Sequence, residues 1–142
     1  MEGMLTGLRH RLDRALHRME EQHRQLREIA DRLDGAIAGG SPAEIERWLD
    51  RFGDALRSHF DLEEGVVFPA VHGLAESVRA DLARLERDHA ALLDGVYGLV
   101  TRASASDALV DALAALRREL RDHEKLEESV MAQVIETTDA ER

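Results

Sequence analysis

The stretch Ser58-His59-Phe60-Asp61-Leu62-Glu63-Glu64 (residues 58–64) is echoed by Asp122-His123-Glu124-Lys125-Leu126-Glu127-Glu128 (residues 122–128), and both contain His-x-x-Leu-Glu-Glu. In an α-helix, side chains four residues apart are separated by only about 40° around the axis. Each histidine and the first glutamate after it should therefore point in the same direction. The second glutamates lie about 140° from the histidines and are expected to face solvent. The repeat predicts two similar helix pairs related by a pseudo-twofold axis.

An apolar seam with the spacing of amphipathic helices runs through four segments of the chain. In each segment a histidine interrupts the seam, and in two segments a glutamate interrupts it again four residues later. Every predicted core stripe is thus broken by polar residues. In order, the four seams are Leu5, Leu8, Leu12, Leu16, Met19, His23, Leu26, Ala30, Leu33 and Ile37; Ile45, Leu49, Phe52, Leu56, His59, Glu63 and Val66; Val78, Leu82, Leu85, His89, Leu92, Val96 and Leu99; and Leu109, Leu113, Leu116, Leu120, His123, Glu127, Val130 and Val134.

Three breaks divide the chain into these helices, at residues 39–42, 69–73 and 104–107. At the first break, Ser41 can accept hydrogen bonds from first-turn amides, and Pro42 needs no donor at that position. Short connections make consecutive helices antiparallel neighbours. We therefore expect an all-α fold, an up-down-up-down antiparallel four-helix bundle, as a single domain covering residues 1–142.

The composition argues against several classes of function. The formal net charge of −10, with acidic and basic residues mixed along the chain, provides no basic patch for phosphates, so nucleic acid is not an expected partner. No stretch approaches the roughly 20 apolar residues of a membrane span. The start of the chain also lacks the apolar region of a signal peptide. We expect a cytoplasmic protein that does not associate with membranes.

The polar residues of the seams are the candidate metal ligands. Because the chain has no cysteine, a bound metal must take nitrogen and oxygen ligands, and imidazole with carboxylate suits iron, manganese or zinc. Two buried carboxylates would repel each other, and bound cations remove that problem. The repeat favours two metals, each with one histidine pair. The alternative without metal is a purely structural bundle in which the histidines are hydrogen-bonded and the glutamates are protonated. The predicted ligands are His23, His59, Glu63, His89, His123 and Glu127.

Other residues are expected around this site or at the surface. Glu20 and Glu86 each precede a seam histidine by three residues, so they would serve as ligands, as acceptors for a ligand histidine, or as solvated charges. His10 and His17 lie off the first seam and His72 lies in the break at residues 69–73, so all three are expected at the surface. The apolar shell of the site is expected to comprise Leu26, Phe52, Leu62, Val66, Leu92, Val96 and Leu120.

These six residues, with Glu64-Gly65-Val66-Val67-Phe68-Pro69 after the first repeat, resemble the hemerythrin-like, or HHE cation-binding, domain family over nearly the whole chain. The resemblance implies that the four histidines ligate a non-haem centre of two iron ions with an oxo or hydroxo bridge. It also implies that Glu63 and Glu127 bridge the irons. The expected function is binding of oxygen, or of nitric oxide or peroxide, for oxygen or redox sensing or storage. The sequence does not identify a protein partner.

The pattern departs from that of the oxygen-carrying hemerythrins, which it otherwise resembles. Those proteins have a further histidine on the third helix where this chain has Leu93, and an aspartate five residues after the last histidine where this chain has Glu127 at four. Four histidines divided evenly would leave both irons with more exchangeable positions, which favours peroxide chemistry. The alternative function is therefore a diiron enzyme, peroxidase-like or catalase-like, that decomposes hydrogen peroxide or performs oxidation chemistry.

Overall fold

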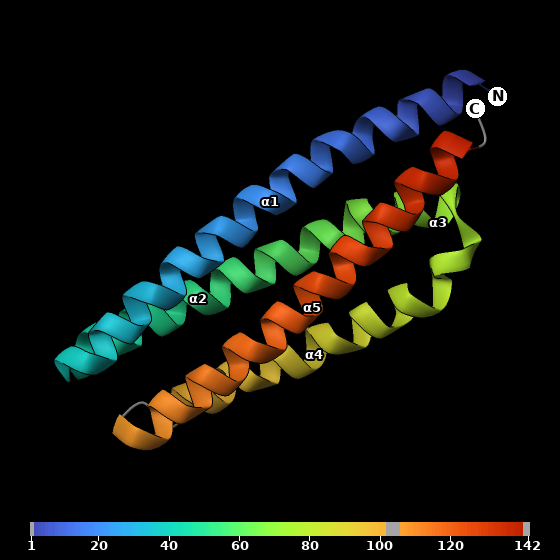
Figure 1. Ribbon diagram of the computed structural model, residues 1–142. Coiled ribbons are helices and arrows are strands. Elements are labelled where there is room, and N and C mark those ends of the chain that lie inside the picture. Colours follow the sequence, from blue (N-terminus) through green and yellow to red (C-terminus); the bar gives the residue numbers. More distant parts are fainter. Residues whose placement is uncertain (1, 102–105, 141–142) are drawn as a thin grey trace.

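The computed structural model describes residues 2–101 and 106–140, and within these ranges it contains helices and no strand. Four long helices, α1 (Glu2–Gly39), α2 (Pro42–Leu62), α4 (Arg79–Thr101) and α5 (Ser106–Ala140), pack in a bundle (Figure 1). Helix α1 contacts α2 and α5, and α4 contacts α2 and α5. The predicted all-α class is confirmed. None of the helices in these two ranges is both long and apolar enough to cross a membrane.

The predicted break between α1 and α2 is confirmed. Gly40 has a φ of 70°, the left-handed conformation that favours glycine at a helix end. The Ser41 hydroxyl accepts a hydrogen bond from the Glu44 amide at 3.4 Å, and Pro42 is the first residue of α2. The predicted break at 104–107 falls largely on residues 102–105, which lie outside the described residues.

The predicted break at residues 69–73 is wrong, because the chain remains helical there. Helix α2 continues into a π-helical turn, η1 (Glu63–Val67), and then into α3 (Phe68–Leu74). The chain turns only at Ala75, ahead of the 3₁₀ turn η2 (Glu76–Val78). In η1 the Phe68 amide donates to the Glu63 carbonyl, five residues earlier. Pro69 has no amide hydrogen and crowds the carbonyl four residues before it, so a wider turn accommodates it without ending the helix.

The π-helical turn also explains one wrong core prediction. Val66 is 42% exposed, whereas the next residue, Val67, is fully buried. A π turn contains one more residue than an α turn, so the buried face moves forward by one position. The other seam residues with described side chains are buried, apart from the partly buried Leu16. The side chains of Leu5 and Leu8 lie outside the described part of the chain.

Two apolar clusters, rather than one continuous core, fill the bundle. The cluster at the α3 end includes Met19, Leu62, Leu85 and Val130. The second cluster lies toward the α1–α2 turn and includes Leu26, Leu56, Leu92 and Leu120. Each of these residues lies within one or two helical turns of a seam histidine on its own helix. All four long helices therefore pass through a polar layer between the two clusters.

Candidate metal centre

The structure brings all six predicted ligands together in this polar layer. His23 comes from α1, His59 from α2, His89 from α4 and His123 from α5. Each of the six side chains is buried, with His23 the most exposed at 8%. The carboxylates are contributed by the first residue of η1 and by α5, four residues after a histidine in each case. The i, i+4 spacing therefore places each of these histidines and its glutamate on the same face of the helix, as helical geometry predicts.

The six residues form two overlapping groups that could each hold a metal ion. In the first group, the Nε2 atoms of His23 and His59 lie 3.0 Å apart, and His23 Nε2 lies 3.0 Å from Glu127 Oε2. The second group consists of Glu63, His89, His123 and Glu127, with His123 Nε2 2.7 Å from Glu127 Oε1. Glu127 belongs to both groups. Glu63 also spans the layer, because its Oε1 lies 2.8 Å from His59 Nε2 and 3.7 Å from His89 Nε2.

The hydrogen bonding of the layer fits bound cations. Both carboxylate oxygens of Glu63, Oε1 of Glu127 and the Nε2 atoms of His89 and His123 are buried and have no hydrogen-bond partner among the described residues. A buried polar atom without a partner costs about 1–3 kcal/mol, and several in one layer are rare in native proteins. Metal ions would satisfy these nitrogen and oxygen atoms together.

Three of the histidines are held by acceptors on neighbouring segments. The Nδ1–H groups donate to Gln22 Oε1 from His59 at 2.9 Å, to Glu64 Oε1 from His89 at 3.1 Å, and to Asp88 Oδ2 from His123 at 3.4 Å. With the proton on Nδ1, each Nε2 lone pair faces the layer, which is the form of histidine that binds metals. Gln22 and Asp88 directly precede seam histidines, yet each supports a histidine on another helix, so the sequence alone did not reveal their role.

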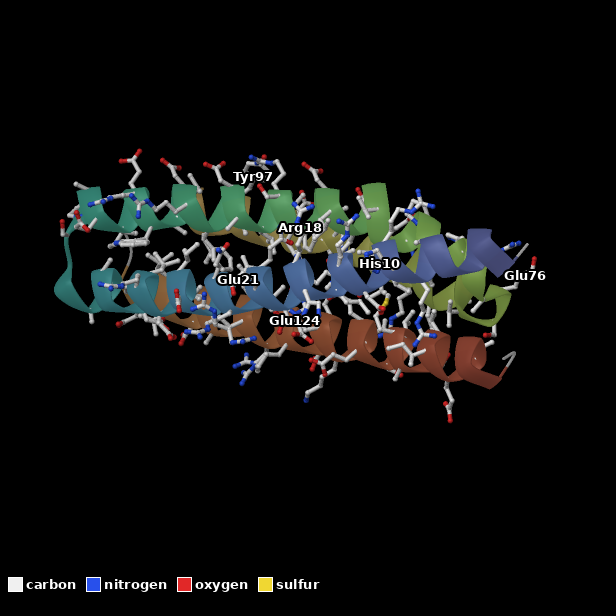
Figure 2. The ribbon with its side chains drawn as sticks, turned by 90° about the horizontal axis from the view of Figure 1, so that it is seen from above. His10, Arg18, Glu21, Glu76, Tyr97 and Glu124 are labelled. Atoms are coloured by element: carbon white, nitrogen blue, oxygen red, sulfur yellow. The ribbon has the colours of Figure 1, made fainter. Side chains whose placement is uncertain are left out.

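The surface predictions have mixed outcomes. His10, His17 and His72 are exposed, as predicted, and Figure 2 shows His10 on the outside of α1. Glu20 and Glu86 are also exposed, which supports solvated charges among the three roles considered for them. The prediction that Glu64 faces solvent is confirmed, since its side chain is 47% exposed, but the carboxylate also reaches His89, which was not predicted. Glu64 lies in the π-helical turn, whereas its counterpart in the repeat, Glu128, lies in regular α-helix and is exposed.

This difference gives a matched test of the histidine supports. Changing Glu64→Gln removes the charged acceptor of His89 and should weaken metal binding by roughly 10-fold to 100-fold. Changing Glu128→Gln, at the equivalent position of the repeat, should leave the affinity unchanged. The measurement is competition with a chelator of known affinity for each variant. Equal losses in the two variants would contradict a specific role for the Glu64–His89 contact.

Two phenylalanines enclose the histidine on α4. The Phe60 ring stacks on His89 with centroids 3.8 Å apart and an interplanar angle of 12°, and Phe68 lies at 5.7 Å and 15°. Both phenylalanines are almost fully buried. Their packing fixes the plane of the imidazole and keeps water away from it.

Burial and proximity separate the acidities of the two central glutamates. Burial raises the pKa of Glu63 to about 9, and the neighbouring Glu127 adds to this increase. Burial alone would raise the pKa of Glu127, but close contacts with the imidazoles of His123, His23 and His59 outweigh it and hold the pKa well below its usual value. Burial would lower the pKa of His123, but the contact with Glu127 outweighs it and raises the pKa. Without metal, Glu63 is therefore protonated at neutral pH while Glu127 is ionised.

Comparison with known proteins agrees with this geometry. The family model of the hemerythrin HHE cation-binding domain matches residues 14–135, a span that includes the whole polar layer. Searches of curated proteins and of solved structures gave no match. Metal-ion binding follows from the family match together with the buried His/Glu cluster. The chain thus belongs to the hemerythrin HHE cation-binding family.

Proposed function

We propose that the polar layer holds two iron ions, one bound by His23 and His59 and the other by His89 and His123. The carboxylates of Glu63 and Glu127 bridge the ions. The centre binds oxygen, or the related ligands nitric oxide and peroxide, for oxygen or redox sensing or storage. The observation that carries the proposal is the pair of overlapping ligand groups that share Glu127.

The residues of the chain have defined roles in this proposal. Bound iron would supply exchangeable coordination positions and one-electron redox chemistry. The two carboxylates balance part of the cationic charge, and Gln22, Glu64 and Asp88 orient three of the imidazoles. The apolar clusters on both sides, together with Phe60, exclude water and larger anions from the layer. These features favour a small, uncharged ligand.

We propose the up-down-up-down antiparallel topology and a single domain over residues 1–142 as the scaffold of this centre. Two observations support it. The N-terminal end of α1 and the C-terminal end of α5 lie at the same end of the molecule as α3, and the α1–α2 turn lies at the opposite end (Figure 1). The helix contacts also close a ring from α1 through α2, α4 and α5 back to α1.

Metal analysis of two histidine variants tests the proposed ligands. Protein produced with iron supplementation should contain two irons per chain, and His89→Ala should lose the iron bound by His89 and His123 while retaining much of the other. His72→Ala, an exposed histidine of α3, should retain both. The measurement is elemental mass spectrometry per chain. Zinc or manganese in preference to iron, or equal content in the two variants, would contradict this assignment.

A second candidate function is supported by the even division of the histidines. Leu93, at the position where the oxygen carriers have their further histidine, is a partly buried residue packed against an apolar cluster and offers no nitrogen. Both proposed irons would then keep exchangeable positions, which suits an enzyme that decomposes hydrogen peroxide or oxidises a substrate. Turnover distinguishes the two functions. A carrier or sensor gives a stoichiometric spectral change that reverses when oxygen is removed, whereas an enzyme consumes peroxide catalytically.

A further inference from the structure

A groove between α1 and α5 is not used by the proposed metal centre. Its volume is about 430 Å³, within the range of about 300 to 1,000 Å³ typical of small-molecule sites. None of the six proposed ligands lines it. Glu124, which is only 9% exposed, lies in the groove, and Figure 2 shows it where α5 faces α1. The groove therefore lies directly beside the polar layer, and Glu124 is near enough to His23, His59 and Glu127 for their charges to act on its carboxyl group.

The groove offers apolar surface to a ligand. Leu26 and Ala30 of α1 and Leu120 of α5 are buried residues that line it. Val110 of α5 also lines the groove and is 48% exposed. Few large apolar side chains among the described residues are exposed to this extent. Burying such a side chain against an apolar ligand is favourable by about 25 cal/mol per Å². The groove thus favours a molecule with an apolar body.

The groove also carries net positive charge, because its lining contains four arginines and two carboxylates, those of Asp34 and Glu124. Arg117 is paired with Asp31 at 2.9 Å and with Asp34 at 2.6 Å. Two further arginines of the same helix, Arg118 and Arg121, line the groove and have no ion pair or hydrogen bond with the described residues. This net positive charge lies next to the apolar surface of the groove, in a chain whose net charge is −10. It matches a ligand with an anionic head.

We propose that this groove binds a free organic carboxylate with an apolar chain, of the medium-chain fatty acid class. Arg118 and Arg121 bind the carboxylate, since guanidinium groups form paired, charge-assisted hydrogen bonds with carboxylates. The chain of the ligand covers Val110 and the apolar floor. A free molecule fits better than a lipid in a bilayer, because the groove is bounded by two helices and is of small-molecule size. The inference goes beyond the proposed metal function and does not depend on it.

Calorimetric titration of the full-length protein with octanoate tests the proposal. We expect saturable binding of one octanoate per chain. Octanol, which lacks the charge, and inorganic phosphate, which lacks the apolar chain, should both bind at least about tenfold more weakly. Phosphate binding as tight as that of octanoate, or binding of anionic vesicles without binding of free octanoate, would overturn the proposal. Absence of saturable octanoate binding would overturn it as well.

Two double variants that remove the same amount of charge test whether octanoate binds in the α1–α5 groove. Arg118→Gln with Arg121→Gln should weaken octanoate binding by about tenfold or more. Arg14→Gln with Arg18→Gln removes two arginines from a separate hollow beside Val66 and should leave it unchanged. All four positions are exposed, so both variants should retain the helical circular dichroism of the parent. Equal affinity in the two double variants would overturn the assignment to the α1–α5 groove. Iron content, measured in parallel, reports separately on the metal proposal.

Discussion

Glu127→Gln is expected to empty both metal positions, whereas loss of a single histidine empties one. Glu127 is the residue common to both ligand groups, and its carboxylate lies within 3.8 Å of the Nε2 atoms of His23, His59 and His123. The amide of glutamine has the same shape but only one acceptor oxygen and no negative charge. Iron content should fall from two per chain to well below one, as measured by elemental mass spectrometry.

The matching control for this substitution is Glu128→Gln, one residue away on α5 and exposed. It makes the same chemical change outside the polar layer, so its iron content should equal that of the parent protein. A Glu127→Gln protein that kept one tightly bound iron would show that the two positions are independent. The shared bridge would then have to be abandoned.

The second large effect is expected in the protein freed of metal with a chelator. Its thermal stability should decrease as pH rises from about 5 to about 9, by an amount on the order of a few kcal/mol. The folded state raises the pKa of Glu63 to about 9 from a usual 4.5, mainly through burial. Between these values the folded state binds a proton that the unfolded state has lost, so each rise in pH favours unfolding. The raised pKa of His123 acts in the same direction.

The low pKa of Glu127 does not oppose this trend, because its contribution to stability is lost only below its usual value of 4.5. The variant Glu63→Gln removes the titrating group and should flatten most of the pH dependence. Metal-loaded protein should not lose stability in this way, since metal binding displaces the Glu63 proton and strengthens as pH rises. The measurement is the midpoint of thermal unfolding by circular dichroism at several pH values. Metal-free protein that became more stable between pH 5 and 9 would contradict the assignment of Glu63 as the protonated partner.

The regular part of the site could be predicted from the sequence because helical geometry is simple. A histidine and a glutamate four residues apart on an apolar seam must enter the core together, and His123 with Glu127 does so. The seam also predicts His23 and His59 in the same layer, because the short α1–α2 connection fixes the relative heights of its two helices, and their Nε2 atoms lie 3.0 Å apart. Helical periodicity therefore predicts the ligand positions correctly where the backbone is a regular α-helix.

The irregular part could not be predicted in the same way. The sequence predicts a helix end at Pro69, but the π-helical turn before it keeps the chain helical and moves the buried face from Val66 to Val67. The contacts of Gln22 and Asp88 depend on the rotation of one helix against another, which a single sequence does not encode locally. Glu64 differs from Glu128 only through backbone geometry. Helix packing determines the contacts of Gln22 and Asp88, whereas the π-helical turn before Pro69 determines the positions of Val66 and Glu64.

The division of the core into two apolar clusters has a consequence for how such a protein can evolve. The clusters hold most of the buried apolar side chains, and the polar layer between them holds the metal chemistry. Most apolar side chains of the clusters pack against one another, whereas Phe60 and Phe68 also stack on His89 of the layer. A substitution in the layer therefore changes a small part of the apolar packing. Ligand sets can therefore diversify by single substitutions within one inherited scaffold, because selection on chemistry and selection on folding act on different sections of the same helices.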